Sequence, residues 1–162
     1  MYQENRNQQQ IYRSAVSGLY ARIKSYYDFI YEKFGDDGLK LIEDMSRRYG
    51  LDVAQRAKNT LDDTSITSVA NYLLRIFETV THGKKVIHTI NTDDNTFIIK
   101  VDECPLHFTE VKMCRAHTTM EKTVVNTLNP ELKYRIGKSI PAGDAYCEHI
   151  LEVKGKEVSS GD

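Results

Sequence analysis

The chain has 162 residues, of which 40% are hydrophobic and 28% are charged, and its formal net charge is −1. This length suits one domain with a single core, and this composition is that of an ordinary globular protein. The balanced charge argues against a nucleic acid or an anionic membrane as partner, and no apolar run reaches the roughly 20 residues that span a bilayer. The polar first ten residues do not resemble a signal peptide, so we expect a cytoplasmic protein.

The first half of the chain has the periodicity of helices. From Ile11 through Leu19 to Ile30, apolar residues recur at three- and four-residue steps, as the inward face of a helix requires. Gly35 is expected to end this first helix, and Gly50 to end a second helix before a short third one. Ser65 is the predicted N-cap of a further helix that runs to Gly83.

At Lys84 the apolar pattern changes to the alternation that is typical of strands. The expected order is a hairpin, a helix and two further strands, at residues 85–91, 96–102, 109–128, 131–140 and 145–153. In the second strand Phe97, Ile99 and Val101 are expected to face the core. The predicted fold class is therefore α+β: an N-terminal helical layer packed on a four-stranded, mainly antiparallel sheet with a ββαββ C-terminal half.

One domain accounts for this pattern. Residues 1–10 are expected to form a disordered polar N-terminus, and residues 156–162 a loose tail. Residues 11–155 form the predicted domain, with the helical layer in residues 11–83 and the sheet and its connecting helix in residues 84–155. The apolar faces of the helices exceed what one small sheet covers, which favours a homodimer.

Thiol and imidazole groups are concentrated in the second half of the chain. Cys104 lies just before the predicted helix, and the residues that share one face of that helix are Cys114, His117, Thr118 and Glu121. Cys147 and His149 share one face of the last strand, and Asp144 lies in the turn before it.

Three interpretations of this group are open. The cysteines can be small buried residues, because free Cys is often buried. They can be zinc ligands, with Cys104, Cys114 and Cys147 joined by a His or Glu, although the usual pair of neighbouring cysteines is absent. One of them can be a nucleophile whose pKa is lowered by a helix N-terminus or a nearby base. A disulfide framework is not expected for an odd number of cysteines.

Several segments occur in the order found in one family, namely GLKLIEDMSRRYG, ECPL, MCRAH, LNPEL and SIPAGDAYCEHILE. Over residues 20–153 the chain resembles the L-2-amino-thiazoline-4-carboxylic acid hydrolase-like family of small bacterial proteins. Its layout is also similar to that of vinyl-reductase-type small-molecule-binding domains. The resemblance implies the opening of a cyclic C–N bond and makes Cys104, Cys114 and Cys147 the first site candidates.

These observations favour an enzyme, a hydrolase that opens a thiazoline- or amidine-type ring. In this hypothesis a thiolate of Cys114 or Cys147 attacks the ring carbon, and His117 or His149 transfers the proton. Glu121 or Asp144 orients the imidazole, and these two residues with Thr118 contact the substrate. No cofactor is then expected, and the partner is a small-molecule substrate.

The alternative function is a sensor or carrier domain that encloses a small apolar ligand. In that interpretation a structural zinc ion is held by Cys104, Cys114 and Cys147.

Overall fold

The structure is a computed structural model, and it describes residues 7–81, 87–93 and 95–155, with the backbone alone for 87–93. The expected loose tail at residues 156–162 and the first six residues of the expected disordered N-terminus lie outside the described residues. So does the predicted helix end at Gly83.

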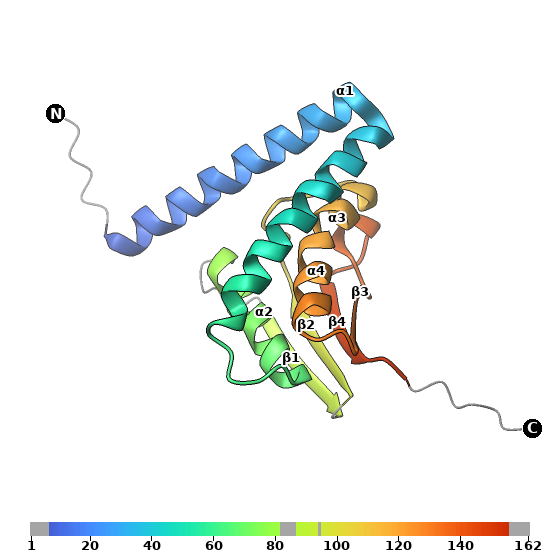
Figure 1. Ribbon diagram of the computed structural model, residues 1–162. Coiled ribbons are helices and arrows are strands. Elements are labelled where there is room, and N and C mark those ends of the chain that lie inside the picture. Colours follow the sequence, from blue (N-terminus) through green and yellow to red (C-terminus); the bar gives the residue numbers. More distant parts are fainter. Residues whose placement is uncertain (1–6, 82–86, 94, 156–162) are drawn as a thin grey trace, which may run out of the picture.

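The chain begins with one long helix, α1 (Gln8–Lys58). Its N-cap is Asn7, whose side chain accepts a hydrogen bond from the N–H of Gln10. At Gly35 the backbone leaves the helical region, with φ 56° and ψ −133°, a conformation that glycine adopts readily. The expected break at Gly35 therefore divides α1 into a first arm, residues 8–34, and a second arm, residues 36–58, which meet at an angle (Figure 1).

The expected helix end at Gly50 is wrong, because α1 continues through this residue to Lys58. A Cβ atom on Gly50 would lie 2.7 Å from the carbonyl oxygen of Met120. Glycine is present here because two helices approach closely, and not because the backbone turns. A single sequence gives no means to separate these two reasons.

The remaining elements follow in chain order: α2 (Ile66–Val80), β1 (Ile87–Asp93), β2 (Thr96–Val101), α3 (Val111–His117), α4 (Thr119–Leu128), β3 (Leu132–Ile136), a 3₁₀ turn η1 (Ile140–Ala142) and β4 (Cys147–Val153). Ser65 caps α2 as predicted, since its side chain accepts a hydrogen bond from the N–H of Ser68. The helix expected over residues 109–128 consists of two helices that are joined at Thr118.

The sheet is antiparallel, and β4 lies between β2 and β3. Cys147 pairs with Val101, and His149 is opposite Ile99 on one side and Ile136 on the other. At the outer edge the backbone of β1 pairs with β2.

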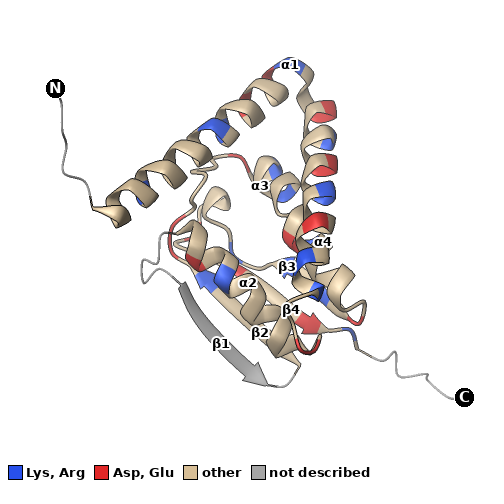
Figure 2. Ribbon diagram, turned by 60° about the vertical axis from the view of Figure 1, so that its left-hand side comes forward, with Lys and Arg blue, Asp and Glu red and all other residues tan. Residues whose placement is uncertain are grey.

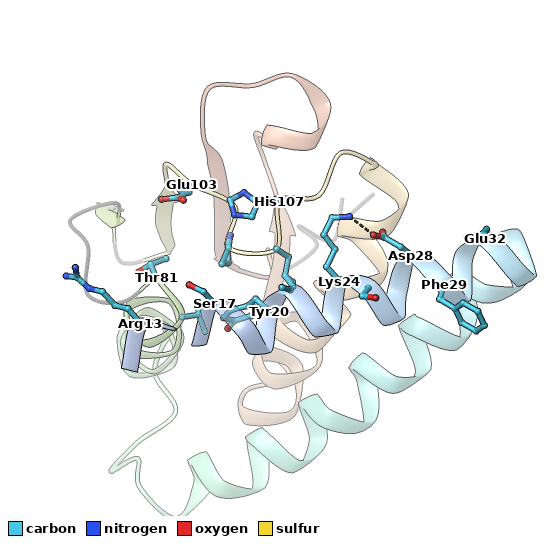
Figure 3. A pocket seen from close by; sticks show the side chains of 15 residues that line it. Arg13, Ser17, Tyr20, Lys24, Asp28, Phe29, Glu32, Thr81, Glu103 and His107 are labelled. Atoms are coloured by element: carbon cyan, nitrogen blue, oxygen red, sulfur yellow. Dashed lines mark hydrogen bonds and ion pairs between the residues drawn. The ribbon is translucent and has the colours of Figure 1, made fainter. Parts of the chain in front are cut away.

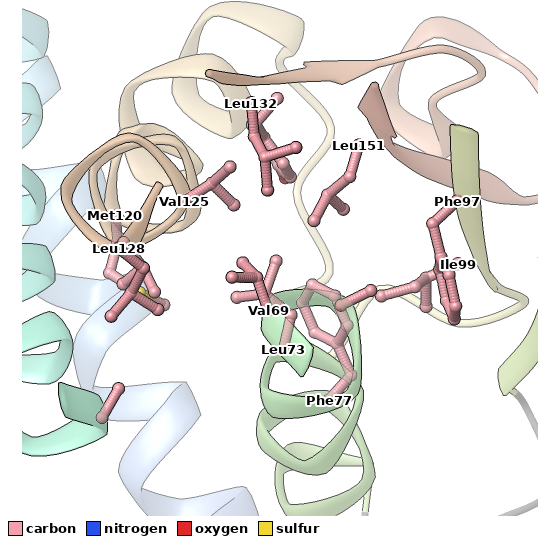
Figure 4. Close-up of a cluster of buried hydrophobic side chains, with 14 of the residues drawn as sticks. Val69, Leu73, Phe77, Phe97, Ile99, Met120, Val125, Leu128, Leu132 and Leu151 are labelled. Atoms are coloured by element: carbon pink, nitrogen blue, oxygen red, sulfur yellow. The ribbon is translucent and has the colours of Figure 1, made fainter. Parts of the chain in front are cut away.

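The main core lies where α2 and α4 meet the sheet (Figure 4). Its fully buried members include Leu73 from α2, Ile99 from β2 and Leu151 from β4. The predicted inward positions Phe97, Ile99 and Val101 are all buried, so the face of this strand is confirmed. A second core cluster joins α1 to α3 and to the segment before it, with Tyr27, Ile42 and Phe108 among its members.

The predicted layout, a helical layer on a four-stranded sheet, is wrong. The strands whose side chains are described number three, β2, β4 and β3, and helices α2 and α4 contact them. The long helix α1 instead packs on α3 and α4 and encloses α3 between its arms (Figure 2). The physical reason is that Ile11 and Leu19, which were expected to face inward, are exposed, whereas α2 has a continuous buried face. The two consecutive helices α3 and α4 also replace the single helix of the expected ββαββ unit.

None of the helices in the described part of the chain combines the length and hydrophobicity that a membrane-spanning segment needs.

Candidate functional site

A cavity of about 450 Å³ lies between the two arms of α1, the helices α2 to α4 and the end of the sheet. We call it the inner cavity. Its wall is mostly apolar and aromatic, with Tyr20, Ile23, Tyr27, Phe77, Phe108 and Met120 among its members. Leu19, Tyr26, Met45 and Tyr49 also line it although each is about half exposed, so they form a rim between the two arms of α1.

A wider groove of about 900 Å³, the outer groove, adjoins the inner cavity. The residues common to both are Tyr20, Val80, Thr81, Glu103, Pro105 and Leu106. Figure 3 shows Arg13 and Lys24 on the first arm of α1, with Glu103 and His107 on the opposite wall. Lys24 is paired with Asp28 at 2.5 Å. The inner cavity therefore adjoins a groove whose wall carries charged side chains.

The structure brings seven of the eight predicted site residues to the wall of the inner cavity. They are Cys104, Cys114, His117, Thr118, Glu121, Cys147 and His149. Asp144 is the exception, because its carboxylate accepts a hydrogen bond from the N–H of Ser139, at 2.8 Å, inside its own turn. Residues that are distant in sequence therefore converge on one cavity, while their chemical roles stay predictions.

The thiols of Cys114 and Cys147 are not activated. Cys114 is buried, and loss of hydration raises the pKa of its thiol to about 12, with Cys147, Cys104 and Glu121 acting in the same direction. Burial also raises the pKa of the Cys147 thiol, although this sulfur accepts a hydrogen bond from the N–H of Ile140 at 3.3 Å. A nucleophilic thiolate requires the opposite shift.

The two histidines are neutral and bonded to tyrosines. The hydroxyl of Tyr27 is 3.3 Å from Nδ1 of His117, and that of Tyr134 is 2.6 Å from Nδ1 of His149. Desolvation lowers the pKa of both imidazoles to about 4. Within the described part of the chain, no hydrogen bond joins a cysteine thiol to an imidazole.

Glu121 is the one acidic side chain in the group that is almost fully buried, with 4% of its surface exposed. Desolvation raises the pKa of its carboxyl group to about 7, and a hydrogen bond to its own main chain opposes this shift. Near neutral pH the carboxyl group is therefore present in both protonation states.

The zinc alternative finds no ligand set among these residues where the structure describes their side chains. Among the side chains that the structure describes, no three His, Cys, Asp or Glu residues are grouped so that they could hold a metal ion. Cys104, Cys114 and Cys147 share the cavity wall without forming such a ligand set.

Sequence reasoning missed Ser46, Tyr27 and Tyr134 as parts of the site. One signal was available for Ser46, because Ile42, Ser46 and Gly50 follow one another at four-residue steps on a buried helix face. A hydroxyl group on a buried helix face normally has a hydrogen-bond partner, so this serine indicates a polar contact in the interior. For the two tyrosines no local signal exists, since their histidine partners are 90 and 15 residues away.

Comparisons with known proteins place the fold. No protein-family model matches the chain, and no curated protein matches it. A solved structure, trafficking protein particle complex subunit 3 from Naegleria fowleri covalently bound to palmitic acid, has a similar fold with a TM-score of 0.58. The two chains are 14% identical, and the match covers 88% of this chain and 97% of that one.

The fold is therefore α+β and similar to that of a trafficking-complex subunit. This finding corrects the classification of the chain as a hydrolase, because the fold match is to a subunit of a trafficking complex and not to a hydrolase. The resemblance to the thiazoline hydrolase-like family stays a prediction.

Proposed function

We propose that this chain is a binding domain that encloses an apolar small molecule in the inner cavity. The observation that carries the proposal is the cavity itself, about 450 Å³ in volume and mostly lined by hydrocarbon and aromatic rings. Ligand sites in proteins have volumes of about 300–1,000 Å³, apolar walls and a small number of polar groups. A small-molecule-binding domain is the alternative function drawn from the sequence, here without its zinc ion.

The chemical state of the polar wall residues supports binding rather than catalysis. The Cys114 thiol is protonated at neutral pH, and both imidazoles are neutral with one nitrogen already bonded to a tyrosine. Such groups give shape and hydrogen bonds to a site without supplying a nucleophile or a strong base.

The similar solved structure supports a hydrocarbon chain as the apolar part of the ligand, because that subunit is covalently bound to palmitic acid. It also supports a role for this chain beside protein partners, since that protein belongs to a multi-subunit particle. The exposed apolar side chains of α1, Phe29 and Phe34 among them, suit such contacts, and a homodimer is one form that they can take.

Titration with a fluorescent long-chain hydrocarbon probe tests the proposal. Ile136 lines the cavity and Ile140 does not, while both are half-buried against the same core. We expect Ile136→Phe to weaken probe binding by about tenfold or more, and Ile140→Phe to leave it unchanged. Absence of probe binding to the wild-type protein, or equal effects of the two variants, would overturn the proposal.

A further inference from the structure

Two buried oxygen atoms of residues that line the inner cavity make no hydrogen bond of good geometry among the described residues, although the hydroxyl of Tyr27 lies near one of them, that of Ser46. They are Oε2 of Glu121 and Oγ of Ser46, and their side chains are 4% and 5% exposed. A buried oxygen without a partner destabilises a fold by about 1–3 kcal/mol. Two such atoms in residues that line one cavity therefore point to a missing hydrogen-bonding group.

The crossing of two helices brings these atoms to the same part of the wall. The second arm of α1 touches α4 at Gly50, where a Cβ would lie 2.7 Å from the carbonyl oxygen of Met120. Ser46 lies one helical turn before Gly50, and Glu121 is the residue after Met120. Ser46 and Glu121 are thus neighbours, along their own helices, of the two residues that form this contact between α1 and α4.

The remainder of the cavity wall offers a ligand mainly hydrocarbon contacts. The hydroxyl of Thr118, which also lines the cavity, already donates to the carbonyl oxygen of Arg115, and the two imidazoles are bonded to tyrosines. Among the fully buried wall atoms that the structure describes, those without a hydrogen bond are Oγ of Ser46 and Oε2 of Glu121.

The chemistry of this pair selects the group that it can receive. A carboxylate oxygen of Glu121 accepts a hydrogen bond, and the hydroxyl of Ser46 donates one. A ligand hydroxyl both donates and accepts, so it satisfies both atoms at once. A ligand carboxylate would instead place a second negative charge beside the ionised form of Glu121 in a poorly hydrated site, so the fatty acid is disfavoured above pH 7.

We propose that the apolar ligand of the inner cavity ends in an uncharged hydroxyl group, which is bound between Glu121 on α4 and Ser46 on α1. The inference rests on the proposed binding function and adds the class of ligand, a long-chain alcohol rather than a free fatty acid.

Displacement of the hydrocarbon probe by three ligands of equal chain length tests this inference. The ligands are a primary alcohol, its methyl ether and the fatty acid. On the wild-type protein we expect the alcohol to displace the probe about threefold to tenfold more strongly than either of the others. Equal displacement by alcohol and ether would overturn the inference, and continued probe binding would leave the binding function intact.

Variants assign the effect to the two residues. Ser46→Ala and Glu121→Met should remove the preference for the alcohol over the ether, while Glu121→Gln should keep it and improve binding of the fatty acid. Thr119→Val is the matched control, because it removes a hydroxyl that donates to the same carbonyl oxygen of Arg115 and does not line the inner cavity, and its preference should equal that of the wild type. If Glu121→Met does not fold, Ser46→Ala decides: an unchanged preference in this variant would contradict the inference.

Discussion

The hydroxyl of Tyr134 lies 2.6 Å from Nδ1 of His149, and this hydrogen bond joins the neighbouring strands β3 and β4. Both side chains are buried. The bond occupies one nitrogen of the imidazole and thereby explains how a histidine is accommodated on a buried strand face.

Tyr134→Phe should lower the free energy of unfolding by about 1–3 kcal/mol, because the buried Nδ1 of His149 loses its partner. Urea unfolding of the purified protein measures this change. Tyr146→Phe is the control, since its hydroxyl accepts a hydrogen bond from Lys138 at the surface, and it should alter stability by no more than about 0.5 kcal/mol. Equal losses in the two variants would contradict a structural role for the Tyr134–His149 pair.

Stability should depend on pH through three buried groups. The folded-state pKa values of His117 and His149 are about 4, below the value of 6.5 for a free imidazole. Their contribution is complete above pH 6.5 and is lost as the pH falls toward 4, because the unfolded chain binds the protons. Glu121 has the opposite sign: its pKa rises from 4.5 to about 7, so its contribution is complete below pH 4.5 and is lost as the pH rises through 7.

Two histidines outweigh one carboxyl group, so the stability of the wild-type protein should rise between pH 4.5 and 6.5. Glu121→Gln should steepen this rise and gain about 3 kcal/mol relative to the wild type between pH 4 and pH 8. Four groups interact electrostatically with the Glu121 carboxylate, and all have raised pKa values: Tyr20, Tyr27, Cys114 and Tyr134. They stay neutral over this pH range, so they do not titrate together with Glu121. Urea unfolding across this pH range measures the difference, and parallel curves for the two proteins would contradict the assignment to Glu121.

Gly50→Ala should destabilise the protein by about 1–3 kcal/mol, because the added Cβ would lie 2.7 Å from the carbonyl oxygen of Met120. Gly18→Ala is the matched control in the same helix, where a Cβ would meet no atom within 4 Å. It should stabilise by up to about 1 kcal/mol through helix propensity. Thermal unfolding compares the two variants, and stabilisation by both would show that the α1–α4 contact is looser than described.

The thiols should differ in their rate of alkylation. Cys104 is partly exposed, whereas Cys114 and Cys147 are 9% and 8% exposed and have raised pKa values. Iodoacetamide at neutral pH should therefore modify Cys104 faster than either of the others, by about tenfold or more. Peptide mass mapping over time measures the rates. Fastest reaction at Cys114 or Cys147 would mean that an activated thiolate is present after all, as the thiol mechanism requires.

The sequence by itself determined the features that depend on near neighbours. Ser65 caps α2, Gly35 interrupts α1, and Ile99 and Val101 face the core, because caps, positive φ and two-residue alternation are set by a few adjacent residues. The same alternation placed Cys147 and His149 on one buried face.

Only the tertiary structure decided the features that join distant segments. Gly50 allows a close contact with Met120, which is 70 residues further along the chain. His117 is hydrogen-bonded to Tyr27, which is 90 residues away. The position of α1 against α3 and α4, rather than on the sheet, follows from the same kind of contact. These relationships depend on which surfaces fit together after folding, and a pattern read along one chain does not contain that information.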